Sequence, residues 1–346
     1  MKILSFLNSI FKIVILFLFF SPFLITVSCG DAGKNNLGKN DSLAPALKVL
    51  FEKIERDPKN ADLYYERAEY YFTQKDTKGA FDDMNKAIQL EPGKAKYHIR
   101  LSDYYFAQNR TRNTRNELIQ AVQVEPKNTE ALSKLGELYY LVKNYDSAVY
   151  YIDRSINCAP ENAKPYYEKG MALKEKGDSA KAAASFQTAV EKDPKYYDAF
   201  LQLGNIFGAH KDKLCIEYYN NALKLDPKST DVMYGMGLYY QNIGDKNNAR
   251  LLYSQLIQLD PKNAYAVYNL GYISLVLDKD PRKAKDLFDK AMVVDPNYAD
   301  AVYMRGVCFE KLGDKKNAAA DFNAAILIDP EHELAMNGLR RLSEKK

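Results

Sequence analysis

Nine prolines recur almost every 34 residues along this chain of 346 residues. They are Pro58, Pro92, Pro126, Pro160, Pro194, Pro227, Pro261, Pro296 and Pro330, and the successive gaps are 34, 34, 34, 34, 33, 34, 35 and 34. A fixed period in this range is the signature of a repeat solenoid, and a period of 34 indicates pairs of helices. The spacing therefore predicts an elongated binding scaffold rather than a catalytic domain.

Two further columns recur when each repeat is counted from the third residue after its proline. The eighth position holds a small residue: Ala68, Ser102, Gly136, Gly170, Gly204, Gly237, Gly271 and Gly306. A bulky side chain recurs near the twenty-fourth position: Met84, Leu118, Ile152, Phe186, Tyr219, Tyr253, Phe288 and Phe322. A mid-helix glycine costs roughly 1 kcal/mol relative to alanine. Helix propensity therefore cannot explain the six glycines at the eighth position. We expect the two helices of each pair to approach each other closely at this position.

The proline of each repeat is expected to end the second helix and to set the turn into the next repeat, because it cannot continue a helix. Turn signals also separate the two helices of a pair. Three of them contain glycine followed by aspartate: Lys176-Gly177-Asp178, Ile243-Gly244-Asp245 and Leu312-Gly313-Asp314. Each repeat is therefore predicted to be a helix hairpin.

These columns resemble the tetratricopeptide repeat family over eight consecutive units, from Ala61 to about His332. The resemblance implies an all-α fold, a right-handed α-solenoid of eight repeats (residues 61–332) with about eighteen helices and no sheet. A partial leading repeat (43–60), with a helix over Leu47 to Glu55, and a capping helix (333–346) would cover its ends. Repeat five is one residue short near His210 and repeat seven has one extra residue around Pro281, which we expect to alter turns only.

The amino terminus has the pattern of a secretory signal peptide over residues 1–28. Lys2 and Lys12 precede an apolar run from Ile13 to Phe20, and small residues follow it. An uncleaved transmembrane helix and plain secretion are the alternatives. The segment Thr26 to Cys29 resembles a bacterial lipoprotein box, which implies that Cys29 carries a lipid and becomes the mature amino terminus.

Residues 29–42 are rich in Gly, Asn, Asp and Lys, which indicates a flexible tether. Gly30 follows the cysteine directly, and by resemblance to lipoproteins of two-membrane bacteria this favours the outer membrane. The side of the membrane that the repeats would face stays open. The expected location is therefore the cell envelope, with the lipid as the membrane anchor.

Composition and motifs exclude several classes of function. Without residues 1–28 the chain has 47 basic and 45 acidic residues, so its net charge supplies no reason to expect nucleic acid as a partner. His98, His210 and His332 lie far apart and lack metal-ligand spacing. Phosphate-binding loops and nucleophile elbows are absent from the sequence. We therefore predict no enzyme, no cofactor and no metal site; Cys158, Cys215 and Cys308 are expected to be unpaired and buried.

In the related family, positions two, five, nine and twelve of each first helix line a concave groove. At the amino-terminal end these positions are rich in carboxylates: Asp62, Glu69, Asp103, Glu130 and Glu137. The fifth position is tyrosine in five of eight repeats: Tyr65, Tyr167, Tyr234, Tyr268 and Tyr303. Towards the carboxyl end, Leu238, Tyr265 and Tyr272 lie at the same groove-lining positions of the first helices, which together are called the wall. The sequence thus predicts a groove that is acidic in repeats one to three and aromatic in repeats six to eight.

Such a groove suits an extended or helical peptide with Lys or Arg at one end and apolar anchors at the other. The predicted function is a lipid-anchored scaffold that binds partner polypeptides in an assembly of the cell envelope. The alternatives are a glycan or solute receptor whose tyrosines stack on sugar rings, and an accessory lipoprotein of an outer-membrane assembly or secretion machine. Self-association is also open, as is a purely structural role in which the tyrosine rings pack between helices and bind nothing.

Overall fold

The computed structural model describes residues 45–344, and within that range it contains eighteen α-helices and one π-helical turn, with no strand. The all-α prediction and the expected number of helices are confirmed. The chain divides into two compact units, residues 1–56 and 57–346. Helix α2 (Pro45–Arg56) is the described part of the first unit. The predicted signal peptide, Cys29 and the tether over 29–42 lie outside the described residues.

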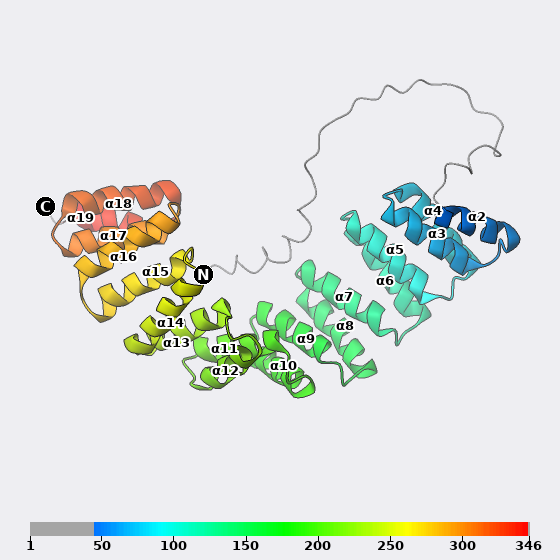
Figure 1. Cartoon of the computed structure of the whole chain (residues 1–346), viewed down its shortest axis with the longest axis horizontal. Helices are drawn as coiled ribbons and strands as arrows, with labels where there is room; N and C mark the ends of the chain where they lie inside the picture. Colours follow the sequence, from blue (N-terminus) through cyan, green and yellow to red (C-terminus); the bar gives the residue numbers. More distant parts are fainter. Residues whose placement is uncertain (1–44, 345–346) are drawn as a thin grey trace, which may run out of the picture. The chain divides into compact units, whose positions relative to one another are not determined.

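The second unit is a succession of helix hairpins in chain order (Figure 1). The first helices of the eight hairpins are α3 (Ala61–Thr73), α5 (Ala95–Ala107), α7 (Thr129–Leu141), α9 (Ala163–Glu175), α11 (Tyr197–Ala209), α13 (Thr230–Asn242), α15 (Ala264–Tyr272) and α17 (Ala299–Lys311). The second helices are α4 (Thr77–Leu90), α6 (Thr111–Val124), α8 (Tyr145–Cys158), α10 (Ser179–Lys192), α12 (Leu214–Leu225), α14 (Lys246–Leu259), α16 (Pro281–Val294) and α18 (Lys315–Ile328). Helix α19 (Glu333–Glu344) follows as the predicted cap. Each first helix packs on its own second helix, and each second helix packs on the next first helix.

The repeated prolines lie just after the second helices, as predicted. In the fourth repeat, α10 ends at Lys192, and Asp193 is extended with φ −132° and ψ 99°. A residue before proline is driven out of the helical region by the proline ring, so Pro194 enforces this ending. The side chain of Asn162, a residue of the preceding linker, accepts the Lys164 N–H and caps α9. The linkers therefore end one helix and start the next.

The turn inside each hairpin contains a residue with positive φ, and the same place is used in all eight repeats. Gly177, Gly244 and Gly313 occupy it with φ of 90°, 82° and 84°. In the other five repeats it is Lys75, Asn109, Lys143, Lys211 and Lys279, with φ of 57–62°. An aspartate or asparagine cap often follows; Asp178, for example, accepts the Lys181 N–H and starts α10. The sequence predicts the three glycine turns, whereas it does not predict that four lysines and Asn109 adopt the same conformation.

The core of each hairpin is the contact between the eighth and the twenty-fourth positions. A Cβ atom placed on Gly170 would lie 2.5 Å from a ring carbon of Phe186, and one on Gly204 would lie 2.5 Å from the ring of Tyr219. Both rings are buried. The small column thus exists because a bulky side chain of the second helix lies directly against the backbone of the first. The predicted close approach is confirmed. At Gly170 and Gly204 its cause is an aromatic ring of the second helix that packs against the backbone of the first helix.

The irregular repeats five and seven are built differently from the prediction. In repeat seven the extra residue is absorbed by a π-helical turn, η2 (Ile273–Leu277), at the end of the first helix. One residue inserted into a helix commonly produces such a bulge. In repeat five the missing residue shortens the second helix, α12, to 12 residues instead of 14. The expectation that only turns change was therefore wrong: both irregularities reach into the helices.

A substitution at Gly170 tests the ring-on-backbone contact. Gly170→Val should destabilise the protein by about 2 kcal/mol, because the added carbons overlap the buried Phe186 ring. Gly93→Val is the matched control, since a Cβ at Gly93 meets nothing within 4 Å. Urea unfolding followed by circular dichroism measures both variants. Equal unfolding midpoints for the two variants would contradict the proposed packing.

Candidate functional site

The predicted acidic wall begins with Asp62 and Glu69 on α3, and both carboxylates are already occupied by the next repeat. Asp62 pairs with Lys96 and accepts a hydrogen bond of 2.6 Å from the Tyr97 hydroxyl. These two hydrogen bonds lower the pKa of Asp62. Glu69 Oε1 accepts bonds of 2.6 Å each from Arg100 Nε and from the Tyr104 hydroxyl. The two carboxylates therefore tie neighbouring first helices together.

The same pattern continues along the following helices. Asp103 on α5 pairs with Lys134 on α7 at 2.7 Å, and Glu137 on α7 pairs with Lys164 on α9 at 2.8 Å. Among the described residues, no cation lies within ion-pair distance of Glu130, which is exposed on α7. The carboxylates are where the sequence predicts them, and most of them are neutralised by a cation of a neighbouring repeat. The expected acidic surface of repeats one to three is largely a ladder of ion pairs between repeats.

The signal that was missed is present in the sequence. Arg100 and Lys134 are at the sixth position of their helices, which was not counted as part of the inner wall. Lys96 and Lys164 are at the second position, which belongs to the predicted groove lining, but the prediction considered only the acidic residues there. A residue at position two or six of one repeat reaches a carboxylate of the preceding repeat.

Glu168 is the most unusual charged residue on this ladder. Its side chain is 14% exposed; Oε1 lies 3.1 Å from Lys164 Nζ, and Oε2 is buried without a hydrogen-bond partner among residues 45–344. Burial raises the pKa of Glu168 to about 7, and the nearby Glu137 acts in the same direction, whereas Lys164 opposes it. This carboxyl is therefore harder to ionise than an exposed glutamate, and it lies in the middle of the array.

Four of the five tyrosines at the fifth position pack on the core ring of their own hairpin, whereas Tyr65 packs on Tyr97 of the next repeat at 5.7 Å. The ring centroids are 5.5 Å apart for Tyr167 and Phe186, 6.1 Å for Tyr234 and Tyr253, 5.5 Å for Tyr268 and Phe288, and 5.6 Å for Tyr303 and Phe322. These separations are typical of interacting aromatic pairs. One face of each of these rings is thus part of the hydrophobic core. This supports, for that face, the alternative in which the tyrosines pack between helices and bind nothing.

Tyrosines from the linkers cover a second side of two of these rings. Tyr196 stacks on Tyr167 at 5.1 Å, and Tyr298 contacts Tyr268 at 5.0 Å. Burial raises the pKa of Tyr196 to about 12, and it also raises the pKa of Tyr268. Tyr265, at the second position of α15, is different: it is 57% exposed and touches the ring of Tyr298 at 5.1 Å. Tyr265 is thus the most accessible of the predicted tyrosines, while Leu238 and Tyr272 are half-buried.

Three carboxylates that the sequence analysis did not select lie at the second position of later first helices. They are Asp198 on α11, Asp231 on α13 and Asp300 on α17. Within residues 45–344 no Lys or Arg lies at ion-pair distance from any of them. Burial raises the pKa of Asp198. In the described chain, the wall carboxylates without a Lys or Arg partner are therefore Glu130 in repeat three and, beside the tyrosines, Asp198, Asp231 and Asp300 in repeats five, six and eight.

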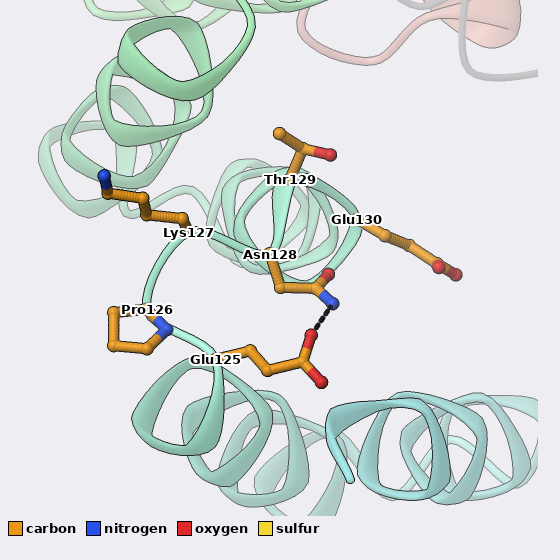
Figure 2. Close-up of a pocket in the computed structure, with 6 residues that line it drawn as sticks. All are labelled: Glu125, Pro126, Lys127, Asn128, Thr129 and Glu130. Carbon is orange, nitrogen blue, oxygen red and sulfur yellow. Dashed lines mark hydrogen bonds between the residues drawn. The ribbon is translucent and has the colours of Figure 1, made fainter.

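An open depression that borders this wall at Glu130 lies at the linker between α6 and α7 (Figure 2). It is lined by residues 125–130, and Asn128 Nδ2 donates a hydrogen bond of 2.8 Å to Glu125 Oε2. Asn128 also accepts the Ala131 N–H and caps α7, while Glu125 Oε1 accepts the Ala95 N–H at 3.4 Å. Its polar groups serve the linker, so we do not regard it as a binding site.

The remaining candidate ligands have structural partners. His98 Nδ1 lies 2.8 Å from Glu117 Oε2, and His332 Nδ1 accepts the Ala335 N–H at 3.2 Å. Cys215 and Cys308 are buried free thiols, and burial raises their pKa values to about 11 and about 12. Across residues 45–344, no group of three His, Cys, Asp or Glu residues could hold a metal ion. In the same range no helix has the length and apolarity needed to cross a bilayer.

A stack of helix hairpins with a wall of first-helix side chains defines an α-solenoid repeat protein. Family profiles for the tetratricopeptide repeat match residues 61–94, 99–163, 167–213, 231–263 and 278–333. The chain therefore belongs to the tetratricopeptide repeat family. This family and fold support an interaction scaffold that binds proteins or peptides, and such scaffolds are generally non-catalytic.

Individual relatives share only parts of their length with this chain. Superkiller complex protein 3 of Mus musculus is 28% identical over 194 residues, which are 54% of this chain and 12% of that protein. The type IV pilus assembly protein PilF of Pseudomonas aeruginosa is 31% identical over 135 residues, 38% of this chain and 53% of that protein. The chain thus spans between 12% and 53% of the length of these relatives.

A solved structure confirms the fold over a larger share of the chain. A tetratricopeptide repeat protein from Parabacteroides merdae superposes with a TM-score of 0.58 at 16% identity, covering 72% of this chain and 98% of that one. At this level of identity the likeness concerns the fold alone.

The ladder can be tested at Glu69. Glu69→Ala should destabilise the protein by about 1–3 kcal/mol, because the fully buried Tyr104 hydroxyl loses its acceptor. Adding Tyr104→Phe should restore part of the loss, since the unsatisfied hydroxyl is then removed. Glu66→Ala, an exposed change on the same helix, serves as the control. The structural role is wrong if Glu69→Ala and Glu66→Ala unfold at the same urea concentration.

Proposed function

We propose that this protein is a lipid-anchored scaffold of the bacterial cell envelope that binds partner polypeptides along its first-helix wall. The observation that carries the proposal is the contrast between the two halves of the wall. In repeats one to four, the inner carboxylates other than Glu130 pair with a Lys or Arg of the next repeat. In repeats five to eight, Asp198, Asp231 and Asp300 have no Lys or Arg at ion-pair distance among the described residues, and Tyr265 is exposed. Groups left unpaired on a rigid surface are available to a ligand.

Tyrosine suits this role because it offers a large contact area and a hydroxyl at a low cost in conformational entropy. Tyr265 is more than half exposed, yet its ring is held by Tyr298, so it is fixed before a ligand arrives. Preorganised groups of this kind lose less entropy on binding. The carboxyl-terminal wall is therefore the better candidate for partner binding, while the amino-terminal wall stabilises the array.

The envelope location rests on the sequence of the amino terminus. The apolar run before Cys29 and the tether after it would place the repeats near a membrane while leaving them free to meet partners. The partial similarity to a type IV pilus assembly protein is in keeping with a role in an envelope assembly. We assign the protein to the outer membrane on the basis of Gly30 after the cysteine.

Partner binding is tested by crosslinking in intact cells, followed by purification and mass spectrometry. The native protein should retain a reproducible polypeptide partner, and Tyr265→Ala with Tyr272→Ala should reduce its yield several-fold. Tyr150→Ala is the control, because Tyr150 is equally exposed but lies on the second helix α8. Recovery of no polypeptide above background with the native protein would contradict the scaffold function.

The anchor is tested at Cys29. Metabolic labelling with a palmitate analogue should mark the native protein, and Cys29→Ala should abolish the label and release the chain from the membrane fraction. A single acyl chain binds membranes only marginally, so firm retention requires more than one. Cys158→Ala, which alters a half-buried thiol within the repeats, is the control. Labelling that survives in the Cys29→Ala variant would overturn the lipoprotein assignment.

A further inference from the structure

The protein contains its own example of a cation held by the wall. Lys96, at the second position of α5, pairs with Asp62, at the second position of α3. Its Nζ atom lies 5.4 Å from the ring centroid of Tyr65 and 5.1 Å from that of Tyr97. These distances fit cation–π contacts. An aspartate at position two and a tyrosine at position five thus form a receptor for an ammonium group, which the next repeat supplies.

The same pair of residues occurs twice more without the lysine. Repeat six has Asp231 and Tyr234, and repeat eight has Asp300 and Tyr303. The residue that corresponds to Lys96 is Tyr265 after the first pair and Leu334 after the second. In the described part of the chain neither aspartate has a Lys or Arg at ion-pair distance. Both places therefore have the aspartate and the tyrosine of the receptor, without a Lys or Arg of the described chain paired to the aspartate. Ala266 and Ala335 stand where Tyr97 does, and Arg341 interacts with Tyr303 at repeat eight.

A second observation at repeat eight indicates a ligand. The His332 side chain is 5% exposed, and its Nε2 lies 3.2 Å from Asp300 Oδ1 without making a hydrogen bond to any described residue. Its other ring nitrogen accepts the Ala335 N–H, so Nε2 is the nitrogen that can donate, on the side where Asp300 lies. Tyr303 packs on this ring at 5.1 Å. This buried nitrogen would gain a hydrogen bond if a cationic ligand held the exposed Asp300 carboxylate in a fixed orientation beside it.

We propose that repeats six to eight bind a polypeptide segment through its Lys or Arg side chains, one at Asp231–Tyr234 and one at Asp300–Tyr303, with the exposed ring of Tyr265 between them. This inference rests on the proposed scaffold function and specifies the chemistry of its partner. The choice of a basic segment follows from charge complementarity. Positions two, five, six, nine and twelve of repeats five to eight contain no Lys or Arg, whereas they contain Asp198, Asp231 and Asp300.

The repeat geometry also predicts the spacing of the two cations. The two sites lie on α13 and α17, which are separated by one intervening first helix, α15. Packed helices lie about 10 Å apart, so the sites are roughly 20 Å apart. An extended chain covers that distance in about six residues. The preferred ligand is therefore a segment whose basic residues are about six positions apart.

The test measures binding of labelled dodecapeptides to the purified full chain by fluorescence anisotropy at 0.15 M salt. The first peptide has Lys at positions 3 and 9 in a Ser/Ala/Leu background; the others replace both Lys by Gln or by Glu. The Lys peptide should bind about tenfold more tightly than the Gln peptide, because each charged pair adds to the free energy of binding. Asp231→Asn with Asp300→Asn should remove this preference.

Matched variants separate local contacts from net charge. Asp82→Asn with Glu191→Gln changes the charge equally at exposed sites on the second helices α4 and α10, and should change the affinity by less than about twofold. Tyr265→Ala should weaken binding several-fold, whereas Tyr265→Phe should retain it because the ring face remains. Thermal unfolding of each variant by circular dichroism shows that the fold is intact.

Several results would overturn the inference. Equal affinity for the Lys and Gln peptides would do so, as would an equal loss with the two double variants. Binding of oligosaccharides that the Lys peptide does not displace would indicate the receptor alternative instead. If cellular crosslinking recovers polypeptide partners whose contacting segments lack basic residues, the scaffold function stands and the assignment of a basic ligand fails. If neither partners nor peptides bind, both proposals fail.

Discussion

The contact on which the rest of the structure depends is a bulky side chain lying on the backbone of the facing helix. In six repeats the facing residue is glycine, and the ring or branched side chain would overlap even a single added carbon. The arrangement recurs along the array because each repeat can bury its apolar side chains only against its own hairpin and its neighbours. It also fixes the positions of the first helices, and these helices carry the wall.

Contacts within and between repeats combine apolar and ionic groups in different proportions. Inside a hairpin the core is mainly apolar, with Phe186, Phe288 and Phe322 fully buried. Largely buried ion pairs such as Arg67–Asp83 and Arg305–Asp321 also join the two helices. Between first helices in the amino-terminal half, ion pairs and tyrosine hydroxyls make the connection, as with Glu69, Arg100 and Tyr104. Exposed ion pairs contribute little individually. Those that also accept a hydrogen bond from a buried hydroxyl contribute more, because breaking them leaves that hydroxyl unsatisfied.

This division gives the two halves of the wall different roles. Groups that are satisfied within the protein are poor receptors, since a ligand would have to displace existing bonds. The wall of repeats five to eight lacks such bonds at Asp198, Asp231 and Asp300 and exposes Tyr265. One array of tetratricopeptide repeats can therefore have a wall that is internally paired at one end and available to a ligand at the other. Changes at a few positions per repeat are enough for this difference.

The sequence by itself determined the fold class, the number of repeats and the residues of the core, because a period of 34 and its small and bulky columns admit only one kind of packing. It also identified the helix that carries the wall. Only the tertiary structure decided which wall charges are free. Asp62 and Asp231 both occupy the second position of their first helices, yet the first meets Lys96 from the next repeat and the second meets no Lys or Arg in the described chain. Long side chains reach across repeats, so their pairing depends on distances and directions between helices that the order of residues does not state.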